Sequence, residues 1–86
     1  MARVTLLYFA SVREAIGIGE EVRDLPEAIA TPRDLIRWLA GLGEGYAMAF
    51  ATPNTLRCAI DQVMTALDAP LGDAKEIAYF PPVTGG

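Results

Sequence analysis

Apolar positions alternate with strand spacing near the start of the chain and again in its second half. Within residues 3–9, Val4, Leu6 and Tyr8 line one face, and the intervening side chains are largely apolar as well. This two-faced pattern predicts a strand that is central in its sheet. Residues 20–25 have a weaker, charge-rich strand pattern. The remaining segments of strand composition lie at residues 56–60, 63–67 and 75–80.

Two segments have the spacing and end signals of helices. Residues 11–14, Ser-Val-Arg-Glu, have the pattern of a capping box that opens a short helix, which Gly17 closes. A longer helix is predicted after Thr31, which suits an N-cap, with Pro32 at the first helical position. Its apolar stripe recurs at intervals of four and three residues, at Leu35, Leu39 and Leu42.

The order of these elements predicts the fold class. Residues 46–54 are interpreted as a loop or short turn, and residues 68–73 as a turn. The sequence strand, short helix, strand, helix and three strands is typical of an α+β domain, in which a mixed sheet carries one main helix on one face. We expect this single domain to occupy residues 1–80 and an extended tail to occupy residues 81–86.

Composition excludes several classes of function. The chain has 86 residues, a net charge of −4, one cysteine and no histidine. The acidic balance argues against nucleic-acid binding, which needs Lys and Arg to displace counterions. Without histidine, Ser-His-Asp and Cys-His mechanisms and histidine-bearing metal sites are excluded, and one cysteine forms no internal disulfide. No apolar run approaches the ~20 residues of a membrane span, so we expect a cytoplasmic chain. We also expect that the chain holds no metal.

The last six residues are unusual in composition. Pro81 and Pro82 lack amide hydrogens, so the sheet should end before them and the chain should leave as an extended segment. Six extended residues reach at most ~20 Å. Gly85 and Gly86 have no side chains, so the tail would be a thin probe that ends in a carboxylate.

Residues 79–86, Tyr-Phe-Pro-Pro-Val-Thr-Gly-Gly, closely resemble the C-terminal signature of the family of molybdopterin synthase small subunits. The resemblance extends along essentially the whole chain. It includes the motifs at residues 8–10, Tyr-Phe-Ala, at residues 12–14, Val-Arg-Glu, and at residues 68–71, Asp-Ala-Pro-Leu. It implies a ubiquitin-like β-grasp fold with a flexible tail.

The resemblance also implies a chemistry for the terminal glycine. A ubiquitin-activating-like adenylyltransferase would convert the carboxylate of Gly86 to an acyl-adenylate, and a sulfur donor protein would then replace AMP and leave a thiocarboxylate. ATP would be used by the activating partner, and this chain would bind no cofactor. The chain would be a non-catalytic sulfur carrier in a heterotetramer with the large synthase subunit. The residues expected to enter the partner are Pro81, Pro82, Val83, Thr84 and Gly85.

Three apolar residues correspond in the resemblance to positions that contact the large subunit: Phe9, Met64 and Phe80. A place in the hydrophobic core is the alternative for each of them. Because one long helix covers only one face of the sheet, an exposed apolar patch on the other face is the favoured interpretation. Cys58 lies in strand phase with Leu56 and Ile60, which favours a buried, unreactive thiol over a role in sulfur transfer.

Two alternative functions share the fold and the Gly-Gly end. A carrier that serves thiamine thiazole synthesis would be shorter and would lack the run Phe-Pro-Pro-Val-Thr at residues 80–84. A protein modifier would join its C-terminus to lysines of other proteins after the same adenylation. The molybdopterin synthase carrier is the favoured function, since the run at residues 80–84 matches that family.

Overall fold

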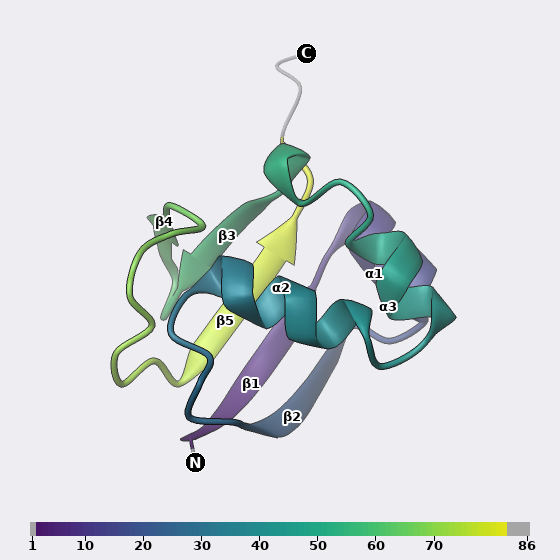
Figure 1. Cartoon of the computed structure of the whole chain (residues 1–86). Coiled ribbons are helices and arrows are strands. Elements are labelled where there is room, and N and C mark those ends of the chain that lie inside the picture. The colour runs from purple at the N-terminus through teal and green to yellow at the C-terminus, as the bar shows by residue number, and fades with distance from the viewer. Residues whose placement is uncertain (1, 83–86) are drawn as a thin grey trace.

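A computed structural model describes residues 2–82 of the chain (Figure 1). In chain order the elements are β1 (Ala2–Tyr8), α1 (Ala10–Ile16), β2 (Glu20–Leu25), α2 (Pro32–Ala40), α3 (Glu44–Ala49), the 3-10 helix η1 (Pro53–Thr55), β3 (Arg57–Ile60), β4 (Val63–Thr65) and β5 (Glu76–Phe80). The predicted α+β class is confirmed. None of the helices in the described residues is long and apolar enough to cross a membrane.

The strands form one mixed sheet in the order β2-β1-β5-β3-β4. The first and last strands, β1 and β5, pair in parallel, whereas the other three pairs are antiparallel. As its two-faced pattern predicts, β1 is an interior strand, with β2 and β5 on either side. Because β1 and β5 run in the same direction, with Tyr8 opposite Tyr79, their carboxyl ends meet at one edge of the sheet.

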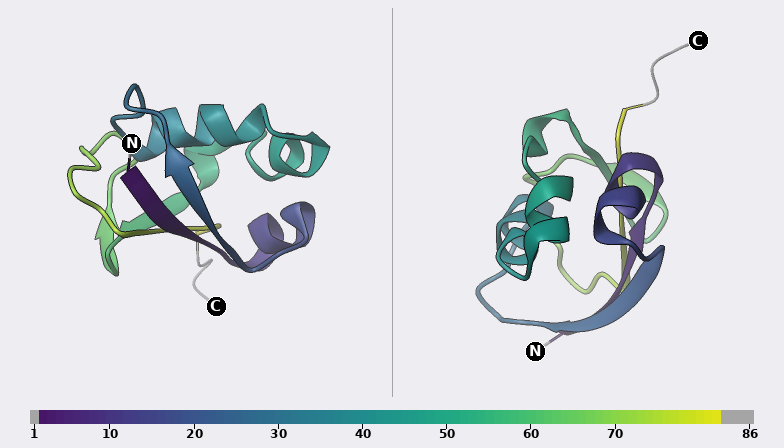
Figure 2. Two further views of the ribbon diagram at one scale, coloured as in Figure 1. Left: turned by 90° about the horizontal axis from the view of Figure 1, so that it is seen from below. Right: turned by 90° about the vertical axis from the view of Figure 1, so that its right-hand side faces the viewer.

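Helices α2 and α3 lie on one face of this sheet, and α1 lies beside the end of β1 (Figure 2). The core fills the space between the helices and the sheet. Tyr79 is fully buried there, and its hydroxyl donates a hydrogen bond of 2.8 Å to the carbonyl of Pro32 at the start of α2. Phe50 packs edge-on against the rings of both Tyr8 and Tyr79. Cys58 is fully buried in the same cluster, which confirms the predicted core position.

The predicted end signals of the helices are partly confirmed. The hydroxyl of Thr31 accepts a hydrogen bond from the amide of Asp34 at 3.1 Å, so Thr31 is the N-cap of α2. Gly17 ends α1 in the left-handed conformation, with a φ of 97° that favours glycine. However, α2 ends at Ala40, so Leu42 lies beyond the helix and is exposed.

The capping box predicted at residues 11–14 is wrong. Helix α1 begins at Ala10 with Phe9 as N-cap, so Ser11 already lies inside the helix. The amides of Val12 and Arg13 donate the first hydrogen bonds of the helix to the carbonyl of Phe9, and no side chain caps this end. The end of β1 is hydrogen-bonded to its neighbours up to this residue, and this tertiary constraint sets the start of the helix.

The loop predicted at residues 46–54 is also wrong, because α3 occupies its first part. Neighbouring glycines argue against a helix on propensity alone. Here Tyr46 fixes the segment, since its hydroxyl donates to a carboxylate oxygen of Glu21 on β2 at 2.7 Å. A side chain at Gly45 would place its Cβ 2.7 Å from the carbonyl oxygen of Ala15, so glycine lets α3 pack closely on α1. These long-range contacts outweigh the local preference.

A tight hairpin positions the start of β5. Asp61 and Gln62 join β3 to β4 with positive φ values of 48° and 72°. One carboxylate oxygen of Asp61 accepts hydrogen bonds from the amides of Lys75 and Glu76, both at 2.9 Å. The hairpin therefore holds the first residues of β5 in place, and the strand reaches the opposite edge of the sheet at Phe80.

Candidate docking face and tail exit

The sheet face opposite α2 and α3 is covered by none of the helices in residues 2–82 (Figure 2). Residues that pair across neighbouring strands share a face. One row of paired residues crosses four strands on this face: Leu7, Ala78, Ala59 and Met64. All four are apolar, so the centre of the open face is hydrophobic, and Met64 on the edge strand is 61% exposed.

Two phenylalanines lie together at the edge of the open face. Phe9 directly follows β1, and Phe80 is the last residue of β5. Their ring centroids are 6.4 Å apart in an edge-to-face arrangement, and the amide of Phe9 donates to the carbonyl of Tyr79. Phe9 is 48% exposed and Phe80 is half-buried. The parallel pairing of β1 and β5 therefore produces an aromatic pair where the sheet ends.

The structure places Phe9, Met64 and Phe80 on the same open face. Phe9 and Phe80 contact one another, whereas Met64 lies on β4, two strands away from β5. The row between them contains residues to which sequence reasoning gave no partner contact: Leu7, Ala59 and Ala78. Strand alternation within residues 3–9 already sets Leu7 on the face of Phe9, whereas only the strand register assigns Ala59 and Ala78 to it. Contact with a partner protein stays a prediction for Phe9, Met64 and Phe80.

The tail begins at this same edge. Pro81 is half-buried and Pro82 is exposed, and both follow directly on Phe80. Neither residue has an amide hydrogen to donate, so the hydrogen bonds of β5 end with Phe80. The remaining predicted tail residues lie outside the described part of the chain: Val83, Thr84, Gly85 and Gly86.

Arg57 begins β3 at the tail edge and pairs with Phe80 in the register. Its guanidinium is exposed and donates one long hydrogen bond of 3.4 Å, to the carbonyl of Leu56. It forms no ion pair with any residue of the described range 2–82. Sequence reasoning gave Arg57 no role, since its place beside Phe80 follows only from the pairing of β3 with β5.

The covered side of the sheet holds a polar cluster instead. Glu21 accepts hydrogen bonds of 2.7 Å from the hydroxyls of Tyr8 and Tyr46 and one of 3.0 Å from Arg23. The Arg23 guanidinium also lies over the rings of Trp38 and Tyr46. Burial, and then the hydrogen bond to Glu21, raises the pKa of Tyr8 well above its ordinary value. The polar groups of this cluster form hydrogen bonds with one another and link β2 to α3.

The described residues offer little chemistry of their own. Burial raises the pKa of the Cys58 thiol above its ordinary value, and its sulfur donates to the carbonyl of Thr65 at 3.2 Å. A thiol with a raised pKa is less often the reactive thiolate. Between residues 2 and 82, no group of three or more Asp, Glu, Cys or His side chains is placed to hold a metal ion.

Comparison with known proteins gives matches over nearly the whole chain. Residues 6–86 match the profile of the ThiS family. The chain is 35% identical over 89 residues to the molybdopterin synthase sulfur carrier subunit of Escherichia coli strain K12, with 96% of this chain and 99% of that protein covered. It is 36% identical over 83 residues to the corresponding subunit of Haemophilus influenzae, with the same coverage.

Among solved structures, the small archaeal modifier protein 1 of Haloferax volcanii has a similar fold. It superposes with a TM-score of 0.71 at 22% identity, and 96% of this chain and 100% of that chain are covered. At this identity the likeness is one of fold alone.

Proposed function

On the premise that this chain belongs to the ThiS family, we propose that it is the sulfur carrier subunit of molybdopterin synthase and that it carries sulfur on Gly86. The chain has the ubiquitin-like β-grasp fold, and its curated relatives are named sulfur carrier subunits. One observation carries the proposal: the likeness to those subunits spans 96% of this chain and 99% of each of theirs. The modifier proteins of known structure share the fold at 22% identity, which supports no particular function for this chain.

The proposed chemistry takes place at the carboxylate of Gly86 and proceeds in two steps. A carboxylate is a poor electrophile, so one of its oxygens first attacks the α-phosphorus of ATP and displaces pyrophosphate, which gives an acyl-adenylate. A hydrosulfide equivalent from a sulfur donor protein then attacks the acyl carbon, and AMP leaves with its bonding electrons. The product is a thiocarboxylate in which sulfur has replaced one oxygen. The thiocarboxylate then donates this sulfur to the pterin precursor.

The partners supply the groups that this chain lacks. We assign ATP binding to an adenylyltransferase of the ubiquitin-activating type, and sulfur supply to a separate donor protein. The large synthase subunit would bind the pterin and receive the tail, in a heterotetramer of two small and two large subunits. This chain supplies the acyl group, the tail and a surface that docks on each partner.

The geometry near Phe80 supports this division of work. The tail starts beside the Phe9–Phe80 ring pair, so a partner that takes up the tail also covers the open face. Two prolines reduce the conformational entropy that residues 81–86 lose on docking. Six extended residues reach at most ~20 Å, so the terminal carboxylate can enter a deep pocket while the folded domain stays at its rim. Glycine at positions 85 and 86 keeps the entering segment thin.

An intact-mass measurement tests the proposal. The untagged chain is incubated with ATP, the activating enzyme and a sulfur donor, with partners that are active on a known carrier. We expect a mass gain equal to sulfur minus oxygen, and no gain for the variant that lacks Gly86. A wild-type chain whose mass does not change would contradict the sulfur-carrier function.

A second measurement identifies the acceptor of the sulfur. The thiocarboxylate form is mixed with the large subunit and the pterin precursor, and the dithiolene product is assayed. Product formation distinguishes molybdopterin synthesis from a thiazole carrier. Isopeptide-linked conjugates without such product would indicate a protein modifier instead.

A further inference from the structure

We infer that Arg57 is a docking residue, which meets a carboxylate at the rim of the pocket where the large synthase subunit receives the tail. The inference rests on the proposed function and adds to it one contact and the chemical character of the partner surface.

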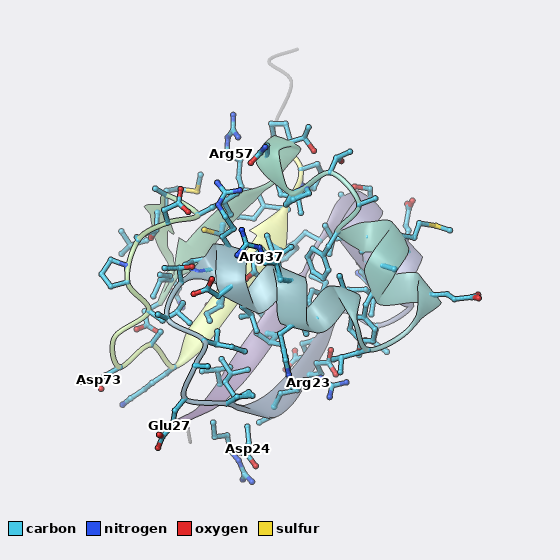
Figure 3. The ribbon with its side chains drawn as sticks, viewed as in Figure 1. Arg23, Asp24, Glu27, Arg37, Arg57 and Asp73 are labelled. Carbon is cyan, nitrogen blue, oxygen red and sulfur yellow. The ribbon has the colours of Figure 1, made fainter. Side chains whose placement is uncertain are left out.

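Arg57 lies where such a contact would form. It is the first residue of β3, and its Cα partner across the sheet is Phe80, the last residue before the tail. Paired residues share a face, so Arg57 stands on the open face beside the Phe9–Phe80 ring pair. Figure 3 shows Arg57 at the edge of the molecule where β5 ends. A protein that covers the two rings would also cover this guanidinium.

The two arginines of α2 differ from Arg57 in having carboxylate partners within the chain. Arg33 forms a two-point contact with Asp68, at 2.7 and 3.3 Å, and Arg37 lies 3.8 Å from Asp34. Arg57 forms no ion pair with residues 2–82. Its charge is therefore left available for a carboxylate of another molecule.

The acidic side chains labelled in Figure 3 lie at the opposite edge of the molecule: Asp24, Glu27 and Asp73. The chain as a whole carries a net charge of −4, so a cation at the tail edge is a local exception. Basic side chains accompany the acidic ones at that opposite edge, since Figure 3 places Arg23 near Asp24 and since Arg3 pairs with Asp24 at 3.2 Å. A negative rim on the partner would attract Arg57, which has no neutralising carboxylate among residues 2–82.

The reach of the tail indicates a protein carboxylate rather than a nucleotide phosphate as the partner of Arg57. Gly86 is six residues beyond Phe80, and an extended segment of that length reaches ~20 Å. When residues 81–86 are extended on docking, a group that reacts with Gly86 lies far beyond the reach of one arginine side chain beside Phe80. Arg57 can meet only the entrance of the pocket. There the neighbouring apolar surface excludes water on docking, and charge pairs are stronger in the resulting lower dielectric.

The test measures association of the purified large subunit with the wild-type carrier, Arg57→Glu, Arg57→Ala and Arg3→Glu. Arg3→Glu is the matched control because it makes the same charge change at the other end of the sheet, where Arg3 pairs with Asp24. At low ionic strength we expect association with Arg57→Glu to be about tenfold slower and with Arg57→Ala about threefold slower. Arg3→Glu should stay within about twofold of wild type, and added salt should remove the differences.

Equal rates for Arg57→Glu and Arg3→Glu would overturn the inference, since net charge alone would then explain the effect. A defect confined to adenylation, with normal binding of the large subunit, would also overturn it and place the carboxylate on the activating enzyme. Unfolding temperatures of all variants should match that of wild type. A failed sulfur-carrier function would be recognised separately, because the wild-type chain would then gain no sulfur.

Discussion

The two faces of β5 divide the molecule into a part that maintains the fold and a part that is available to partners. Tyr79 is fully buried, contacts Phe50 and donates a hydrogen bond to the start of α2. Phe80, its immediate neighbour, faces the other way and has the ring of Phe9 beside it. Successive residues of a strand point to opposite faces, so one step along the chain separates the core from the open surface.

The comparison shows how a domain of this size can present a hydrophobic surface without losing its core. The helices all contribute to one side of the sheet, and the core cluster forms there. The row from Leu7 to Met64 on the other side has no such cover. Substitutions on the covered face should therefore lower the free energy of unfolding, whereas those on the open face should weaken partner binding.

The largest expected effect is that of Tyr79→Ala. Removal of a fully buried ring that contacts Phe50 should cost about 3–5 kcal/mol of unfolding free energy, which is a large part of the stability of a small domain. Urea denaturation followed by circular dichroism measures the change. Tyr79→Phe is the matched control: it keeps the ring, loses the hydrogen bond to Pro32 and should cost about 1 kcal/mol. A Tyr79→Ala chain as stable as wild type would contradict the division between faces.

Phe80→Arg should weaken partner binding and leave the stability of the fold largely unchanged. The domain should stay folded, because the ring lies on the open face, but binding to the large subunit should weaken by about 2 kcal/mol if Phe80 is an anchor of the interface. Titration calorimetry measures the affinity. Val22→Arg is the control, since Val22 is an exposed residue of the same face on β2, paired with Thr5 and away from the tail edge. Global unfolding of Phe80→Arg would assign this residue to the core.

A smaller effect is expected for Cys58→Ala. The thiol is fully buried on the covered face, so loss of its sulfur should cost roughly 1 kcal/mol of unfolding free energy. Sulfur transfer should remain at the wild-type rate, because the proposed chemistry takes place at Gly86. Thermal melts and the intact-mass assay check both statements. A folded Cys58→Ala chain that no longer acquires sulfur would show that the thiol takes part in the chemistry.

The sequence predicts the covered face better than the open one. The apolar residues of β1, the cap at Thr31 and the burial of Cys58 follow from spacing and residue type, since a core imposes these patterns locally. Helix α3 could not be predicted in this way, because Gly45 and Tyr46 acquire their roles from contacts with Ala15 and Glu21. Local sequence does not record such long-range contacts.

Only some of the apolar residues of the candidate site could be predicted. Phe9, Met64 and Phe80 were recognised from a family resemblance, and the structure places them on one face. Arg57 and Ala59 belong to that face because β3 pairs with β5. The sequence of neither strand predicts this pairing, since the two strands are distant in the chain. The side of the sheet that remains uncovered also depends on where α2 packs, which is a property of the whole fold.

The smallest expected effect concerns the carboxylate of Asp68, whose pair with Arg33 links α2 to the segment between β4 and β5. The hydrogen bond from Arg33 lowers the pKa of Asp68 in the folded chain below its ordinary value. A lowered folded-state pKa means that the pair contributes stability above about pH 4, and that this contribution is lost as the pH falls through the folded pKa. The contribution should be slight because Asp68 is largely exposed to solvent, which screens the pair.

Thermal melts of wild type and Asp68→Asn between about pH 6 and pH 2 should therefore converge at the acid end of the range. Binding of the large subunit at neutral pH should be the same for both chains. Arg33 would then serve the fold, because the carboxylate that pairs with it belongs to this chain. Arg57 would serve binding, because the carboxylate inferred for it belongs to the partner. Melting curves that stay parallel down to about pH 2 would show that the Arg33–Asp68 pair contributes no stability, and that its short distances have no energetic consequence.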